Sequence, residues 1–285
     1  MLVPLAGGGQ ETLLSEVGFV LLPLFTTRDA CALRLVCREF LAAVSEHPWE
    51  DRGTEIKGSI AAWRACFPRA RCANVQKREL GGGVNIRAAP VVDAEFVHFE
   101  GLRELYMAGC QAVTDAAFVH LRGIHTLDMT CCDQPAITDA AFAHLAGIQR
   151  LSMLGCRQAT ITDAAFAHLR GIQLLNMSSC RQLTDAAFVH LRGIHTLYMW
   201  SCYQPAITDA AFAHLRGLHT LVMDWCSQAT ITGATLSSLK SASLLAMRGS
   251  SVAAIAAAQS LGLPVRTEGG ECRALTHKPH VECGY

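Results

Sequence analysis

Apolar residues recur at fixed positions along the middle of this chain: leucine, any residue, methionine, and then cysteine three residues further on. A seventh copy, Leu245-Met247, follows the six complete ones and has Ser250 at the cysteine position. Successive leucines lie 22 or 24 residues apart. A fixed period of this length is typical of proteins that stack one structural unit many times. The complete copies are Leu105-Met107-Cys110, Leu127-Met129-Cys132, Leu151-Met153-Cys156, Leu175-Met177-Cys180, Leu197-Met199-Cys202 and Leu221-Met223-Cys226.

Each copy predicts a short strand. In one of them, Ile124, Leu127, Met129 and Cys132 are apolar, and a polar residue separates Leu127 from Met129. Alternation with a period of two indicates a strand that buries one face. We therefore expect Leu127 and Met129 to face the core, and the residues between them to face the other side of the sheet.

A short helix is predicted after each strand. Thr138 is a favoured N-cap residue, and Asp139 suits the positive end of the helix dipole. Phe142 and Leu145 then fall on one helical stripe, and Gly147 can end the helix. One repeat is thus a strand, a turn and a short helix.

A single repeat of this kind buries too little apolar surface to offset the conformational entropy of about 24 ordered residues. Stacked copies share their buried faces, and their strands form a parallel sheet that grows by about 4.8 Å per repeat. The predicted fold class is therefore α/β: a curved solenoid with the sheet on the concave face and the helices outside.

These repeats resemble the cysteine-containing class of leucine-rich repeat. The LxxLxLxxC pattern of that class is matched by Ile124-Leu127-Met129-Cys132, and its I-T-D sequence before the helix by Ile137-Thr138-Asp139. The resemblance extends over about residues 91–250. It implies short parallel strands on a concave face and helices on a convex face. We place this leucine-rich-repeat solenoid at residues 93–265, followed by a flexible tail at 266–285.

Residues 13–51 lack the repeat and instead predict three short helices. Leucine and valine at helical spacing mark the first helix, and Thr27 or Asp29 can cap the second. A further apolar stripe precedes the His-Pro-Trp sequence at 47–49; it is formed by Leu33, Val36, Cys37 and Phe40.

The N-terminal stretch contains L-x-S-E-V, T-x-R-D, L-R-L-V-C-R-E-F and H-P-W, and in this order it looks like an F-box. The F-box is the helical module that docks on the Skp adaptor of cullin-based ubiquitin ligases, so the resemblance implies a Skp-type adaptor and, through it, a cullin as partners. The adaptor-binding residues that it implies are Leu13, Leu14, Val17, Leu21, Leu24, Leu33, Val36, Cys37, Phe40 and Trp49.

A structural alternative for these helices is a cap on the open end of the solenoid, which every solenoid requires. Residues 52–92 are expected to connect the helical module at 13–51 to the repeats and to supply an irregular first repeat.

Two stretches of the chain, 117–145 and 187–215, lie seventy residues apart and differ at only four positions. All four positions fall within six residues, on the predicted concave face or its rim, whereas the predicted convex residues are the same in both copies. Such clustering indicates that the concave side has a different task from the scaffold. The differing pairs are Asp128 and Tyr198, Thr130 and Trp200, Cys131 and Ser201, and Asp133 and Tyr203.

The concave positions of all repeats form the predicted binding surface for a protein substrate. Tyrosine and tryptophan concentrate binding energy at protein interfaces, so Tyr198, Trp200 and Trp225 are the predicted hot spot. The full predicted set is Tyr106, Asp128, Thr130, Ser152, Leu154, Asn176, Tyr198, Trp200, Val222, Asp224 and Trp225.

Composition narrows the choice of partners and compartment. The 285 residues are 51% hydrophobic, enough for a core, and the 24 basic residues balance 24 acidic ones. Because the chain has no net charge, neither nucleic acid nor a membrane surface is expected as a partner. No signal-like start and no run near the roughly 18 apolar residues of a spanning helix is present. We expect a soluble cytoplasmic or nuclear protein whose thirteen cysteines are reduced thiols.

Cysteines and histidines recur with the repeat. The recurring cysteines are expected to pack at the strand ends and to donate to loop backbone. A row of histidines is expected to be solvated on the convex face; it comprises His98, His120, His144, His168, His190 and His214. The tail adds Cys272, His277, His280 and Cys283, whose spacing is not that of a zinc site. We therefore predict no metal and no cofactor.

The expected function is that of a substrate-recognition subunit of a Skp-cullin-F-box ubiquitin ligase, without catalytic residues of its own. A protein-binding repeat scaffold with no ubiquitin role is the first alternative. A thiol or zinc hydrolase is the second, and it is disfavoured because a catalytic group is normally placed once, whereas these cysteines and histidines repeat with the fold.

Overall fold

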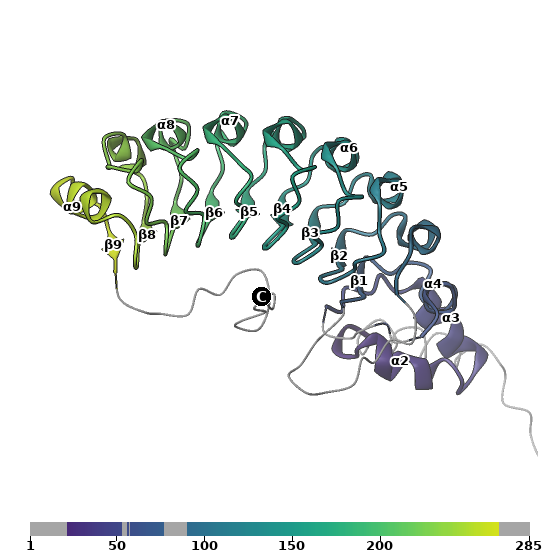
Figure 1. The fold of residues 1–285 in the computed structure, drawn as a ribbon. Coiled ribbons are helices and arrows are strands. Elements are labelled where there is room, and N and C mark those ends of the chain that lie inside the picture. The colour runs from purple at the N-terminus through teal and green to yellow at the C-terminus, as the bar shows by residue number, and fades with distance from the viewer. Residues whose placement is uncertain (1–21, 53–55, 57, 77–89, 268–285) are drawn as a thin grey trace, which may run out of the picture.

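The structure is a computed structural model that describes residues 22–52, 56, 58–76 and 90–267. The predicted adaptor-binding residues Leu13, Leu14, Val17 and Leu21 lie outside the described residues, as does the predicted tail from residue 268 onward, with its cysteines and histidines. A small group of helices at the N-terminal end leads into a curved row of strand-and-helix repeats (Figure 1).

A parallel sheet of nine strands runs along the inner side of this curve (Figure 1). The order of the strands in the sheet is their order in the chain, and every neighbouring pair is parallel. The predicted α/β solenoid is thus confirmed. The strands are β1 (Cys72–Asn74), β2 (Glu104–Tyr106), β3 (Thr126–Asp128), β4 (Arg150–Ser152), β5 (Leu174–Asn176), β6 (Thr196–Tyr198), β7 (Thr220–Val222), β8 (Leu244–Ala246) and β9 (Val265–Arg266).

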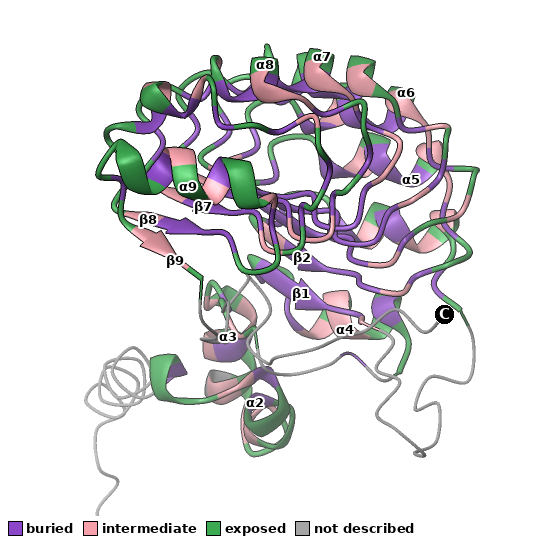
Figure 2. Cartoon of the chain, turned by 60° about the vertical axis from the view of Figure 1, so that its left-hand side comes forward, coloured by how far each residue is buried: buried purple, intermediate pink, exposed green. Residues whose placement is uncertain are grey.

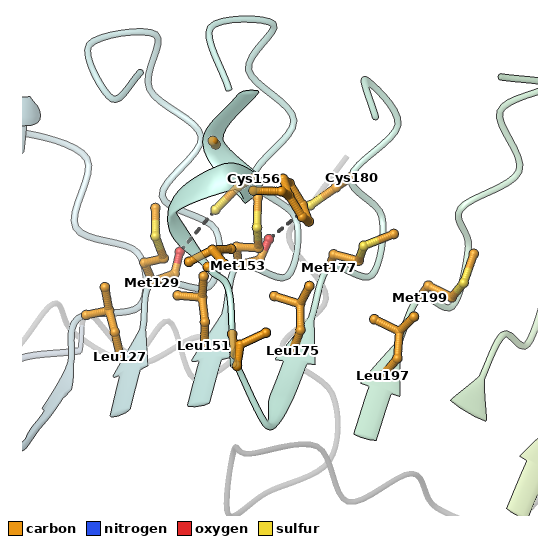
Figure 3. Packing of buried hydrophobic residues seen from close by; sticks show 14 of the residues in the cluster. Leu127, Met129, Leu151, Met153, Cys156, Leu175, Met177, Cys180, Leu197 and Met199 are labelled. Atoms are coloured by element: carbon orange, nitrogen blue, oxygen red, sulfur yellow. Dashed lines mark hydrogen bonds between the residues drawn. The ribbon is translucent and has the colours of Figure 1, made fainter. Parts of the chain in front are cut away.

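The register of the sheet places equivalent residues of the repeats side by side. Leu127 pairs with Leu105 on one side and with Leu151 on the other. These leucines and the methionines two residues further on are fully buried and form continuous rows (Figure 3). The predicted inward orientation of Leu127 and Met129 is confirmed.

Short helices cover the convex side of the sheet, one group per repeat (Figure 1). They are short because the repeat leaves only about seven residues for the outer layer: a single α-turn, a 3-10 turn, or an α-turn that continues as a 3-10 turn. They are η2 (Asp93–Phe99), α5 (Asp115–Phe118), η3 (Val119–Leu121), α6 (Asp139–Phe142), η4 (Ala143–Leu145), η5 (Asp163–His168), α7 (Asp185–Phe188), α8 (Asp209–Phe212), η6 (Leu236–Leu239) and α9 (Val252–Ser260).

Hydrogen bonds of the helix N-termini connect neighbouring repeats. Thr138 caps α6, as predicted, by accepting a hydrogen bond from the backbone N–H of Ala140. The backbone N–H and the hydroxyl of Thr138 both donate to the carboxylate of Asp115 in the preceding repeat, each at 2.7 Å. Asp139 accepts the same pair of bonds from Thr162. The recurring aspartate therefore ties repeats together, besides favouring its own helix.

The cysteine row forms a second set of bonds between repeats. The thiol of Cys156 donates to the carbonyl of Met129 at 3.2 Å, and that of Cys180 donates to the carbonyl of Met153 at 3.1 Å (Figure 3). Ser250, at the cysteine position of the last copy, makes the equivalent bond through its hydroxyl. The expectation that these cysteines pack and donate to backbone is confirmed.

One continuous core fills the space between the sheet and the outer helices, and exposed residues lie mainly on the outer turns (Figure 2). A row of fully buried phenylalanines, including Phe142 and Phe212, runs through it. Gly147 follows the outer helices with φ +86°, a conformation that favours glycine, so the predicted helix stop is confirmed.

The N-terminal helices have a separate, smaller core. Trp49 is its largest member, and its ring meets Phe67 edge-on with 5.7 Å between ring centroids. Trp63 contacts this core and the core of the repeats. The elements of this module are η1 (Leu22–Leu24), α2 (Thr27–Leu33), α3 (Arg38–Glu46) and α4 (Ile60–Cys66).

The cap of α2 differs from the prediction. Thr26, rather than Thr27 or Asp29, is the N-cap residue, and Asp29 completes a capping box with it. Its carboxylate accepts from the backbone N–H of Thr26 at 3.0 Å. Thr27 instead donates to the carboxylate of Asp51, which connects the start of α2 to the segment that follows α3.

Candidate functional site

Four of the predicted substrate-binding side chains on the sheet face are buried. Asp128, Thr130, Ser152 and Asn176 are 0 or 1% exposed. The in-register strands bring short polar side chains within reach of one another, so the hydroxyl of Thr130 donates to Asp128 at 2.6 Å and lies 2.9 Å from the hydroxyl of Ser152. Gln76 covers Asp128 and donates to its second carboxylate oxygen. These side chains are therefore buried, where the prediction placed them on an open concave surface.

Burial also changes the titration of Asp128. It raises the pKa of the Asp128 carboxyl, and the hydrogen bonds from Thr130 offset part of that effect.

Three further predicted contacts, Tyr106, Leu154 and Val222, are no more than 9% exposed, so they too are buried where an open surface was expected. Burial raises the pKa of the Tyr106 phenol, whose hydroxyl lies 3.1 Å from a carboxylate oxygen of Glu104. The side chains in the middle of the concave sheet face are therefore buried within the repeats.

The remaining predicted residues lie at the ends of the strands and are accessible to solvent. Trp225 is 51% exposed, and Tyr198, Trp200 and Asp224 are partly exposed. Tyr203, which was not among the predicted contacts, is 42% exposed. Its position is one of the four that differ between the two copies, so the signal for it was present in the sequence.

Trp225 has an unusual backbone conformation, and its ring packs against a glycine. Its φ is +62°, in the left-handed region that favours glycine, and the equivalent residues Gly155 and Gly249 adopt the same conformation. The indole lies directly on Gly249: a Cβ atom there would come within 2.3 Å of the ring. The guanidinium of Arg248 lies 5.4 Å from the centroid of the Trp225 ring. The ring is therefore held rigidly while half of it faces solvent.

A second arginine and aromatic pair lies beside the first. The guanidinium of Arg181 is 4.3 Å from the centroid of the Tyr203 ring. We refer to the accessible residues at these strand ends as the aromatic rim. The aromatic rim consists of Tyr198, Trp200, Tyr203 and Trp225 together with Arg181 and Arg248.

The predicted adaptor-binding residues are divided between the surface and the interior of the N-terminal helices. Leu24 and Val36 are 77% and 67% exposed. Trp49, predicted as an adaptor contact, is 1% exposed, and its indole N–H donates to the carbonyl of Val44, so it packs inside the module. Leu33, Cys37 and Phe40 are partly exposed.

Three exposed apolar residues of this module were missing from the prediction. Leu35, Phe25 and Leu41 are 79%, 37% and 45% exposed. The apolar stripe from Leu33 to Phe40 does not form one helix, because the chain turns between α2 and α3. That turn places Leu35 and Val36 outward, which a helical stripe did not suggest.

The buried thiols of the cysteine row are poorly suited to act as nucleophiles. Burial raises the pKa of Cys202 to about 12 and the pKa of Cys156 well above its ordinary value. These groups therefore stay protonated at neutral pH.

The histidines of the convex row are at least partly exposed, as predicted. One of them does have a carboxylate neighbour: Nδ1 of His120 lies 2.7 Å from Glu100. Within the described part of the chain, no three histidine, cysteine or acidic side chains are grouped as metal ligands.

Across the described ranges, every helix is too short or too polar to span a bilayer.

Comparison with known proteins shows the fold. The structure is similar to the TLR13–ssRNA13 complex (TM-score 0.56, 14% identity), with 80% of this chain and 33% of that chain covered. It is also similar to internalin C2 from Listeria monocytogenes (TM-score 0.54, 19% identity), with 72% of this chain and 84% of that chain covered. Both have leucine-rich-repeat folds, so the repeats form a leucine-rich-repeat solenoid.

A third match, to the complex of Rad7 and Elc1 in yeast, has a TM-score of 0.40 at 18% identity and covers 51% of this chain and 42% of that one; it supports no conclusion. No protein-family profile matches the chain, and no curated protein matches its sequence.

Proposed function

We propose that this protein is the substrate-recognition subunit of a Skp-cullin-F-box ubiquitin ligase. In this proposal the N-terminal helices α2 and α3 bind a Skp-type adaptor, which brings a cullin, and the aromatic rim of the solenoid binds the protein to be ubiquitylated. A leucine-rich-repeat protein-binding scaffold without a ubiquitin role is the alternative.

One observation carries the choice between these two. Leu24, Leu35 and Val36 are 67% to 79% exposed on a module whose own core is complete without them. Exposed large apolar side chains that are neighbours in a small module, as Leu35 and Val36 are, are typical of an interaction surface. A helical segment that served only as a cap would need apolar residues on its inward face alone.

The capping role is already filled by another helix. α4 packs on η2 at the first repeat, and Ile60 of α4 belongs to the core of the solenoid. Because α4 covers that end, α2 and α3 are not needed for the purpose. Their exposed leucines and valine therefore support a docking function.

The proposed contribution to ubiquitylation is proximity. A receptor that holds a substrate near a charged conjugating enzyme raises the effective concentration of the acceptor lysine. Catalytic side chains are not required for this, and the buried, protonated thiols of the repeats favour a non-catalytic chain.

The adaptor interaction is tested with the full chain by affinity purification from a eukaryotic lysate and by titration with a purified Skp adaptor. The test variant is Leu35→Glu with Val36→Glu, which places two charges on the proposed docking surface. The matched control is Val119→Glu with Val189→Glu, two half-exposed valines on the outer turns of the solenoid. Adaptor and cullin should be recovered with the wild type and the control, and lost with the test variant.

If the wild type recovers no adaptor while its thermal unfolding shows a folded module, the ligase proposal fails and the scaffold alternative takes its place. Equal recovery by all three proteins would mean that the adaptor binds elsewhere, which also contradicts the proposal.

The non-catalytic proposal has its own test, alkylation of the native protein by iodoacetamide. The exposed thiol of Cys31 should react readily, whereas Cys156 and Cys202 should react only at the rate of unfolding, because they are buried and protonated. Mass spectrometry of digested samples gives the rate at each site. Rapid labelling of any buried member of the row in folded protein would indicate a reactive thiol.

A further inference from the structure

The aromatic rim combines two chemistries that point to one kind of ligand. Its rings offer rigid apolar surface, and its two guanidinium groups lie over those rings rather than against carboxylates. The ion pairs formed among the described residues do not involve Arg181 or Arg248. An arginine held on an aromatic face can keep terminal N–H donors for a ligand, and carboxylates are the groups that match its geometry. In Arg181 the Nε is buried, so only the terminal nitrogens can serve.

The charge of the surrounding residues agrees with this reading. The acidic residue of the same strand ends, Asp224, accepts a hydrogen bond from the backbone N–H of Arg248 at 2.7 Å. Its carboxylate thus supports the loop that carries Arg248. The two arginines of the aromatic rim exceed this single acidic side chain, so the surface favours an acidic ligand locally although the chain as a whole is neutral.

The rim is also built before any ligand arrives. Trp225 keeps a left-handed backbone at a position where the neighbouring repeats have glycine or a small residue, and its ring is fixed on Gly249. A bulky residue in this conformation is strained, and strain of this kind is typical of functional sites. A ring fixed in this way loses little entropy when a ligand covers it.

The distance between the guanidinium groups of Arg181 and Arg248 limits the ligand further. Arg181 follows β5 and its guanidinium reaches Tyr203 after β6, whereas Arg248 follows β8 and lies over Trp225 after β7. The guanidinium groups are therefore separated by one to three strand spacings, or roughly 5–14 Å. An extended peptide advances about 3.3 Å per residue, and its side chains alternate between two faces, so two carboxylates two or four residues apart match this distance.

We propose that the aromatic rim binds an acidic segment of the partner protein, with two Asp or Glu side chains, two or four residues apart, paired with Arg181 and Arg248, and an apolar side chain on the same face of the segment in contact with Trp225. This inference rests on the protein-binding part of the proposed function and names the class of substrate segment. A single-stranded nucleic acid also stacks on aromatic rings, but the chain has no net positive charge to attract a phosphate backbone, and the experiment includes such a strand as the competing ligand.

The experiment is selection of a displayed library of random dodecapeptides on the immobilised full chain. Three variants are selected in parallel: Arg181→Gln with Arg248→Gln, Arg181→Lys with Arg248→Lys, and a control, Arg192→Gln with Arg216→Gln, that removes two exposed arginines from the convex side. Thermal unfolding of each variant shows whether it is folded. Selected peptides and copies with Gln in place of Asp and Glu are then measured by fluorescence anisotropy, beside a twelve-nucleotide single strand of DNA.

Peptides selected on the wild type and on the convex control should be enriched in paired acidic residues at the stated spacing. The Gln variant and the Gln peptides should each lower the affinity at least tenfold, and the Lys variant should retain charge but lose part of the affinity because it cannot form bidentate pairs. An acidic enrichment that persists in the Gln variant, a selection without acidic residues, or tighter binding of DNA than of any selected peptide would overturn the inference.

The outcome is independent of the adaptor. Acidic peptides that bind the rim while no adaptor binds the N-terminal helices would leave this inference standing and remove the ligase proposal. Adaptor binding without acidic selection would do the reverse.

Discussion

Two regions of this molecule have almost the same sequence and different surfaces. Residues 117–145 and 187–215 share their strands, turns and helices, and their leucines, methionines and cysteines are buried alike. In the first copy, Asp128 and Thr130 hydrogen-bond to each other inside the protein. In the second, Tyr198 and Trp200 at the same positions are partly exposed. The repeated residues therefore form the scaffold. The six residues of the variable window determine whether the side chains at the concave side of a repeat are buried or accessible to solvent.

The largest expected effect tests whether the two scaffolds are equivalent. Phe142→Ala and Phe212→Ala each remove a fully buried ring at the same position of the two copies. Each should lower the free energy of unfolding by about 3–5 kcal/mol, because the ring leaves a cavity in a packed core. Urea unfolding measures both, and a difference of more than about 1 kcal/mol between them would break the equivalence.

The next largest effect concerns binding. Tyr198→Asp, Trp200→Thr and Tyr203→Asp together give the second copy the side chains of the first at three of the four differing positions. The affinity for peptides selected on the rim should fall by about 2 kcal/mol or more, roughly thirtyfold, because tyrosine and tryptophan dominate such interfaces. Anisotropy titration measures this change, and the melting temperature should stay nearly constant.

The reverse exchange provides the contrast. Asp128→Tyr with Thr130→Trp forces two large rings into positions that are fully buried, so it should destabilise the protein by about 1–3 kcal/mol. If neither exchange lowered the free energy of unfolding, positions 128 and 130 would not be more buried than positions 198 and 200.

A smaller effect separates function from stability at a single residue. Trp225→Gly should abolish rim binding but change the free energy of unfolding by no more than about 1 kcal/mol, since relief of the left-handed strain offsets the lost packing on Gly249. Ser201→Gly, at the equivalent position with φ +57°, should stabilise the fold by up to about 1 kcal/mol and leave binding intact. A large loss of stability in Trp225→Gly would show that this ring is part of the core.

The smallest effect depends on pH. The pKa of Asp128 is raised in the folded state, so the stability linked to its protonated form is complete below the unfolded pKa of about 3.9 and is lost as pH rises through the folded value. Asp128→Asn removes this cost and should raise the melting temperature by a few degrees at pH 7 but not near pH 4. The exposed Asp133→Asn serves as the control. Calorimetry at both pH values measures the melting temperatures. An equal increase at both pH values would contradict burial of the charged Asp128 carboxylate as the cause.

Much of the fold could be predicted from short-range pattern. The alternation around Leu127 and Met129, the cap at Thr138 and the stop at Gly147 all depend on residues within one repeat, and each was confirmed. Local pattern failed where a helical stripe crossed a turn: the residues from Leu33 to Phe40 belong to two helices, and Leu35 became an exposed residue.

The candidate site was predicted less well than the fold. Alternation identifies the side of the sheet to which a side chain points, but exposure depends on which groups cover that side. Asp128 is covered by Gln76, which is 52 residues away in the chain, and by its neighbours in the adjacent strands. For the same reason Trp49 was expected at a surface and is found at the centre of the N-terminal core.

The sequence alone determined the repeat, the direction and register of the strands, the buried rows of leucine, methionine and cysteine, and the window in which the two copies differ. These follow from periods of two and about 24 residues, which are properties of the chain itself. Only the tertiary structure decided which positions of that window reach solvent, that Trp225 sits in a left-handed turn on Gly249, and that Leu24, Leu35 and Val36 are left uncovered. Burial and strain are set by contacts between residues distant in sequence, and a local pattern carries no record of them.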